Sequence, residues 1–184
     1  MRTVVLASGS GTTLQAILDD PELRAHTVAA GTDVPGCRAM QRAAAAGVPT
    51  FAVALADSAD RAAWNDALAE AIAAHEPDLV VLAGFMRILA PAVVRRFRIV
   101  NTHPALLPEF PGAHAVRDAL AAGAGVTGVT VHWVDEGVDT GPVIAQVKVP
   151  VEPGDDEESL RARVQAAEKP LYVSTLRQLI RESA

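Results

Sequence analysis

The chain has 184 residues, half of them hydrophobic, with a formal net charge of −6 at pH 7. This length can bury one substantial core, so we expect a single domain over residues 1–184. No cluster of Lys and Arg marks a nucleic-acid surface, and no apolar run of about 18 residues marks a membrane span, so we expect neither partner. The one cysteine, Cys37, has no partner for an internal disulfide, which favours a reducing compartment, the cytoplasm.

Strand and helix patterns alternate through the first half of the chain. The predicted elements are a strand at 4–7, a helix from Thr12 with Leu14, Ile17 and Leu18 on its buried face, a strand at 27–32, a helix at 37–46 ending at Gly47, a strand at 48–53, a helix capped by Ser58 with Trp64, Leu68 and Ile72 buried, and a strand at 79–82. Strands that are apolar on both faces predict a mostly parallel, Rossmann-like α/β sheet with helices on both faces.

The second half of the chain begins with a predicted strand at 99–101 and a stiff, proline-rich loop at 104–112. Two further strands are predicted at 129–134 and 143–149, and residues 116–128 are expected to form a loop. A last amphipathic helix begins near Glu157, and Pro170 should kink or split it.

A glycine loop follows the first predicted strand, at Ser8 to Thr13. Backbone N–H groups at a helix N-terminus form an anion site, so the loop predicts a phosphorylated ligand. Leu14 replaces the third glycine of a dinucleotide fingerprint, and the lysine of a P-loop is missing. The alternative is a tight turn with Thr12 or Thr13 as the helix N-cap.

Asn101 and His103 lie two residues apart at the exit of a predicted strand, so their side chains should point to the same side. Ligands bind at this edge of a parallel sheet. An amide and an imidazole there can stabilise an oxyanion and move a proton. Taken alone, however, the pair is more often a turn cap and an ordinary loop histidine.

Three motifs, in this order along the chain, favour a catalytic role for the pair over the ordinary one. They are Gly84-Phe85-Met86-Arg87-Ile88-Leu89, Asn101-Thr102-His103-Pro104-Ala105-Leu106-Leu107-Pro108 and Asp139-Thr140-Gly141-Pro142-Val143-Ile144. With them the chain closely resembles the folate-dependent formyltransferases, in particular those that act on glycinamide ribonucleotide (GAR) in purine synthesis. The resemblance runs from Val4 to about Tyr172 and implies the formyltransferase fold. It also implies a phosphate-binding half at 1–98 and a catalytic and folate-binding half at 99–184.

The resemblance implies that Asn101, His103 and Asp139 are catalytic. The formyl group of 10-formyltetrahydrofolate would pass directly to the acceptor amine, with no metal and no covalent enzyme intermediate. Asn101 and a protonated His103 would stabilise the oxyanion of the tetrahedral intermediate. Asp139 would favour the charged imidazole and, with a water molecule, relay the amine proton.

The resemblance also implies binding residues. They are Ser10, Gly11, Thr12 and Thr13 for the acceptor phosphate, Glu168 for the acceptor, Met86, Arg87, Ile88, Leu89, Asn101 and Asp139 for folate, and His132 beside the catalytic group. The alternatives are that Met86 and Ile88 are core residues, Glu168 an exposed helix carboxylate and His132 a plain sheet histidine. Many members have Asn at the position of Thr13, and many continue with another strand or two beyond Ile180.

Two rival classes of function remain. Another formyltransferase or a formyltetrahydrofolate hydrolase would use the same catalytic chemistry, and a non-catalytic module would only bind a phosphorylated or folate ligand. Length and the glycine loop disfavour the first class, and the full catalytic trio disfavours the second. We expect small-molecule substrates only, and a monomer or homodimer.

Overall fold

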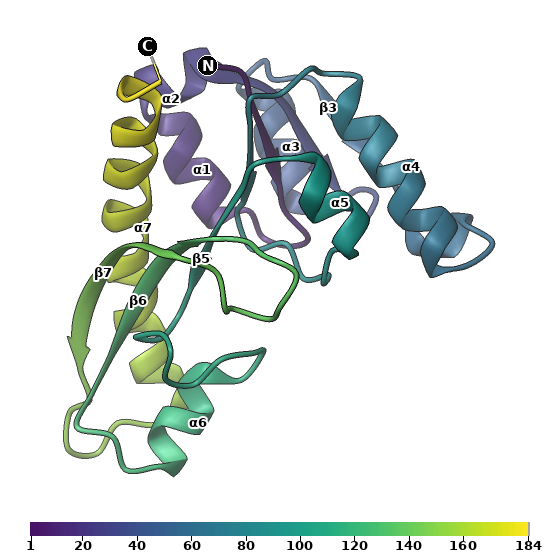
Figure 1. Ribbon diagram of the computed structural model, residues 1–184. Coiled ribbons are helices and arrows are strands. Elements are labelled where there is room, and N and C mark those ends of the chain that lie inside the picture. The colour runs from purple at the N-terminus through teal and green to yellow at the C-terminus, as the bar shows by residue number, and fades with distance from the viewer. Residues whose placement is uncertain (184) are drawn as a thin grey trace.

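A computed structural model describes residues 1–183 of the chain. Its sheet has seven strands in the order β3-β2-β1-β4-β5-β6-β7 (Figure 1). Their bounds are β1 Thr3–Leu6, β2 Thr27–Thr32, β3 Thr50–Ala52, β4 Leu79–Leu82, β5 Ile99–His103, β6 Val126–Trp133 and β7 Val143–Pro150. Strands β1 to β5 pair in parallel, whereas β6 runs antiparallel to both β5 and β7. The predicted mostly parallel α/β fold is therefore confirmed.

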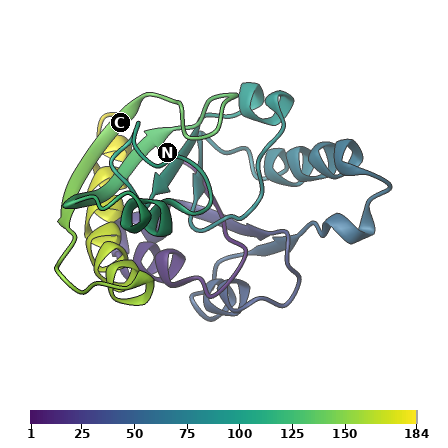
Figure 2. The same ribbon diagram turned by 90° about the horizontal axis from the view of Figure 1, so that it is seen from below.

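Helices cover both faces of this sheet (Figures 1 and 2). Their bounds are α1 Thr12–Asp19, α2 Pro21–His26, α3 Arg38–Ala45, α4 Arg61–Ala73, α5 Pro91–Arg96, α6 Ala115–Ala121 and α7 Glu157–Arg181, with a short 3-10 turn at Leu55–Asp57. Among residues 1–183, none of these helices combines the length and apolarity needed to cross a membrane.

Successive side chains of each strand point to opposite faces of the sheet, so the core has two layers. Val5 and Val81 face α1, α3 and α7, whereas Val4 and Val80 face α4 and α5. Both layers are apolar because each central strand is covered on both sides, which is why these strands are continuous apolar runs. A smaller third cluster joins α6 and the first turns of α7 to β6 and β7.

Most predicted elements lie where the sequence pattern placed them. Strands β2 and β4 have the predicted bounds, α7 begins at Glu157, and Gly47 has the positive φ of a helix end, 76°. The predicted buried stripe of α4 is confirmed, since Trp64, Leu68 and Ile72 are all 0% exposed.

Three local predictions were wrong. The cap of α4 is Asp60, whose carboxylate accepts from the Ala63 amide, and not Ser58. Helix α7 is continuous through Pro170, so of the two predicted effects, a kink or a split, the split was wrong. Residues 116–128 are not one loop, because they contain most of α6 and the start of β6.

Candidate active site

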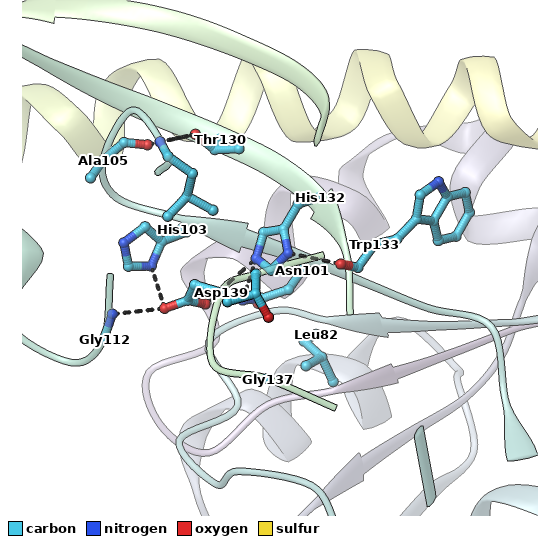
Figure 3. Close-up of polar contacts among 12 residues, drawn as sticks. Leu82, Asn101, His103, Ala105, Gly112, Thr130, His132, Trp133, Gly137 and Asp139 are labelled. Atoms are coloured by element: carbon cyan, nitrogen blue, oxygen red, sulfur yellow. Dashed lines mark hydrogen bonds and ion pairs between the residues drawn. The ribbon is translucent and has the colours of Figure 1, made fainter. Parts of the chain in front are cut away.

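Asn101 and His103 lie on β5 and point to the same face of the sheet, as predicted (Figure 3). In the antiparallel pairing with β6, Asn101 is opposite His132. Directly opposite residues of paired strands lie on one face, so all three side chains gather there. The face is the one opposite α7, since Val100 and Val131 take the α7 side.

Asp139 reaches this cluster from the loop between β6 and β7. Its φ is 55°, a left-handed conformation that Asp tolerates better than most residues. A Cβ on Gly141 would lie 1.8 Å from the Trp133 carbonyl oxygen, so only glycine lets the start of β7 approach the end of β6. The Trp133 amide then donates to the Pro142 carbonyl at 2.9 Å. This close approach of β7 to β6 holds the loop between them so that Asp139 lies next to β5.

The Asp139 carboxylate contacts both histidines (Figure 3). Its Oδ2 lies 3.3 Å from Nδ1 of His103, and its Oδ1 lies 3.6 Å from Nε2 of His132. The Gly112 amide also donates to Oδ2 at 2.8 Å. Burial by itself raises the pKa of Asp139, but His132, the Gly112 amide and the charge of His103 outweigh it and hold that pKa below its usual 3.8. The carboxylate is therefore ionised near neutral pH.

The two histidines are oriented by main-chain carbonyls. Nε2 of His103 lies 2.8 Å from the Phe110 carbonyl oxygen, so this nitrogen carries a proton. Nδ1 of His132 donates to the Trp133 carbonyl at 2.9 Å and leaves Nε2 facing Nδ2 of Asn101 at 3.4 Å. His132 thus contacts both Asn101 and Asp139, and its role beside the catalytic group stays a prediction. His103 and His132 are only 4% and 2% exposed, so both rings are shielded from water.

A pocket of about 280 Å³ opens at the carboxyl end of the sheet, on the side that α7 covers. It is lined by Ser8, Gly9, Ser10, Gly11, Thr12, Thr13, Ala83, Gly84, Met86, Thr102, Pro104, Val116, Arg161, Val164, Gln165 and Glu168. All of the predicted phosphate and acceptor residues are among them. Asn101, His103 and Asp139 do not line it. Thr102 does, and it lies between Asn101 and His103 on β5, so the pocket and the catalytic side chains take opposite faces of the same strand end.

Glycine is required in the loop that forms one wall of this pocket. Gly11 has a φ of 69°, and a Cβ there would lie 2.5 Å from the Ala39 Cα. Gly11 is also the N-cap of α1 and no side chain caps the helix, so neither Thr12 nor Thr13 has the cap role of the alternative interpretation. The first amides of α1 remain free to face an anion.

Thr13 and Glu168 meet across the pocket from α1 and α7. The Thr13 hydroxyl donates to Oε1 of Glu168 at 3.0 Å. Burial raises the pKa of Glu168, against the opposing effects of the Thr13 hydrogen bond and of Lys169. The side chain is half-buried, which contradicts the alternative of an exposed helix carboxylate.

The predicted folate segment divides between surface and core. Met86 and Ile88 are 77% and 68% exposed, so the alternative that they are core residues is wrong. Leu89 is 7% exposed and packs with α4 and α5, which leaves only its main chain to contact a ligand. The Arg87 guanidinium pairs with Asp33 at 2.7 Å.

Sequence reasoning missed several residues of the site. Arg161 and Gln165 precede Glu168 by seven and three positions on α7, a helical spacing that could have found them. The Gly112 amide and the Phe110 carbonyl could not have been found, because main-chain groups carry no sequence signal. Within residues 1–183, no three His, Cys, Asp or Glu side chains gather as a metal ligand set.

Comparison with known proteins identifies the family of the chain. The sequence model of the family described as formyl transferase matches residues 1–176. The chain belongs to the formyl transferase family. It is 56% identical over 179 residues to a phosphoribosylglycinamide formyltransferase of Mycobacterium tuberculosis, a match that covers 95% of this chain and 83% of the relative.

Solved structures of formyl transferases have the same fold. The phosphoribosylglycinamide formyltransferase of Bacillus halodurans matches with a TM-score of 0.93 at 38% identity, covering 100% of this chain and 97% of that one. The glycinamide ribonucleotide transformylase 1 of Symbiobacterium toebii matches with a TM-score of 0.92 at 43% identity, covering 96% of this chain and 86% of that one. The predicted family and its fold are thus confirmed.

Proposed function

We propose that this formyl transferase moves the formyl group of 10-formyltetrahydrofolate to the amine of GAR, giving formyl-GAR and tetrahydrofolate in purine synthesis. The observation that carries the proposal is the meeting of Asn101, His103 and Asp139 beside a pocket walled by the glycine loop. The relatives named above, which carry GAR in their names, support GAR as the acceptor.

The acceptor pocket suits a phosphorylated amine. The N-terminal amides of α1, at the positive end of the helix dipole, face the phosphate. Glu168 lies on the facing wall, on α7, and offers a carboxylate to the polar groups of the acceptor, while the Thr13 hydroxyl on α1 lies next to the phosphate position. Bound in this orientation, the acceptor has its amine directed toward Thr102 and Pro104, next to the catalytic side chains.

The exposed apolar side chains of Met86 and Ile88 suit the flat ring of a formyl-folate donor. Met86 also lines the acceptor pocket, so the two binding regions are continuous. A donor seated on this segment would present its formyl group between the segment and the acceptor amine.

The chemistry uses the three polar side chains in turn. The acceptor nitrogen forms a bond to the formyl carbon, and the carbonyl oxygen becomes an oxyanion. Asn101 donates a hydrogen bond to that oxygen, and protonated His103 donates the Nε2–H that contacts the Phe110 carbonyl in the free protein. The attacking amine loses a proton through a water molecule held by Asp139, the folate nitrogen gains one, and the carbon–nitrogen bond of the donor breaks.

Two further features of the proposal concern the cellular setting. The single cysteine supports the cytoplasm as the compartment, because no internal disulfide can form. We propose a monomer or homodimer that needs no nucleic-acid partner. Chemistry without a metal follows from the roles given to the three side chains.

The proposal is tested by the absorbance change that accompanies loss of the formyl group from the folate donor. We expect the change only when GAR is present, with formyl-GAR formed in equal amount. The same change without any amine would make the chain a hydrolase, and a change only with another amine would reassign the acceptor. Binding of both ligands without any change would favour the non-catalytic module.

A further inference from the structure

Asp33 is a buried carboxylate outside the catalytic cluster. It follows β2, and its side chain is 1% exposed. Its Oδ1 accepts from the Ser8 hydroxyl at 2.5 Å, and its Oδ2 accepts from Nε of Arg87 at 2.7 Å. A carboxylate so far removed from water is stable only while such partners are in place.

The contacts of Asp33 join the two binding regions. Ser8 begins the glycine loop after β1 and lines the acceptor pocket, and Arg87 lies in the segment after β4. The Ser8 hydroxyl, while donating to Asp33, accepts from the Met86 amide at 2.8 Å. The Ser8 amide also donates to the Gly84 carbonyl at 3.1 Å. Loops from three neighbouring strands are thereby tied together.

The ion pair is the charged part of this network. The Arg87 side chain is 38% exposed, so it lies at the surface and pairs with a carboxylate beneath it. Met86 and Ile88, on either side of Arg87, are exposed and make few packing contacts that would fix the segment. Phe85 packs against Trp64 in the core, so burial fixes that end of the segment. The position of residues 86–88 depends mainly on hydrogen bonds, which include the one from Arg61 to the Ile88 carbonyl.

We propose that Asp33 is a positioning residue that holds the folate segment, residues 84–88, against the glycine loop through Arg87 and Ser8. The inference rests on the proposed function in that it takes this segment as the folate site. Asp33 touches neither substrate, and it acts by preorganising the surface on which the donor binds. Its effect should therefore fall mainly on binding of the donor.

The variant Asp33→Asn tests the proposal. It keeps the size of the side chain and an oxygen that accepts from Ser8, but it removes the charge that holds Arg87. We expect the KM for the folate donor to rise about tenfold, the loss of one charge-assisted hydrogen bond, while kcat and the KM for GAR change much less. Arg87→Ala should raise the same KM, and the double variant should add little to Arg87→Ala.

Hydrogen exchange provides a readout that needs no turnover. In Asp33→Asn, the amides of residues 84–88, above all that of Met86, should exchange faster than in the wild type. A matched control is Asp20→Asn, because Asp20 is also a buried carboxylate, 4% exposed, paired with a partly exposed arginine, Arg177. It should lose stability without changing the folate KM or exchange in this segment.

Two results would overturn the role of Asp33. One is a wild-type folate KM and wild-type exchange at 84–88 in Asp33→Asn, and the other is an equal change in Asp20→Asn. Failure of the proposed function can be told apart from failure of the Asp33 role, because the wild type would then show no GAR-dependent turnover. The exchange measurement would still decide whether Asp33 holds the segment.

Discussion

Oδ2 of Asp139 lies 3.3 Å from Nδ1 of His103, although one residue comes from the β6–β7 loop and the other from β5. The contact depends on the antiparallel pairing of β5 with β6 and on the tight return at Gly141. It brings a carboxylate with a lowered pKa to a buried imidazole.

His103→Ala and Asp139→Asn should each lower kcat by about 10²- to 10⁴-fold, the range for loss of a group that moves a proton in the transition state. Binding of a folate analogue, measured by fluorescence titration, should remain measurable in both variants because residues 84–88 are unchanged, with the larger loss in Asp139→Asn, which alters an expected folate contact. Near-normal turnover in either variant would contradict the assigned roles.

Glu168→Gln should change stability and substrate affinity in opposite directions. The pKa of Glu168 is raised in the folded protein, so its ionised form opposes folding. Wild-type stability from this group is fully present below the unfolded pKa of about 4.5 and is lost as pH rises through the raised folded value. The glutamine of the variant does not ionise, so the stability of the variant does not fall with pH for this reason.

Urea unfolding of Glu168→Gln and of the wild type checks this at two pH values. The free energy of unfolding of the variant minus that of the wild type should be larger at pH 7 than at pH 4. The KM of the variant for GAR should be higher than that of the wild type. An unchanged difference between the two pH values would show that burial of this carboxylate has no energetic effect. An unchanged KM would remove Glu168 from the acceptor site.

Gly11→Ala should damage the acceptor site through the main chain. The left-handed φ costs an alanine about 1–2 kcal/mol, and the added Cβ would collide with the main chain at Ala39. Thermal unfolding should therefore occur at lower temperature, and the KM for GAR should rise. Gly125→Ala is the matched control, since Gly125 lies outside the pocket, lacks a left-handed φ, and a Cβ there has nothing within 4 Å. Equal effects of the two substitutions would argue against a special role of Gly11.

Sequence patterns predicted the parts of the fold that depend on local order. The apolar run Leu79–Leu82 was located to the residue, because burial on both faces of a strand leaves a continuous apolar run in the sequence. The start of α7 was predicted near Glu157, where the helix begins. The cap of α4 was missed because Ser58 and Asp60 are both good caps, and only the path of the chain selects Asp60.

The site was less accessible from sequence than the fold. Asn101 and His103 share a strand face, so their common side follows from strand periodicity. Asp139 entered only through the family resemblance, because nothing local shows that its loop returns to β5. The partners of Asp33 were missed altogether, since Ser8 and Arg87 lie on other loops and the ion pair exists only in three dimensions.

The central claim is that Asn101, His103 and Asp139 surround one reacting carbon between the folate segment and the acceptor pocket. A crystal structure with GAR and a non-reactive folate analogue tests it most directly. The account predicts the phosphate at the Gly11–Thr13 amides, the analogue against Met86, and the position of the formyl oxygen within hydrogen-bond distance of Asn101 and His103. An analogue bound elsewhere, or one whose formyl position lies far from these two side chains, would contradict the account.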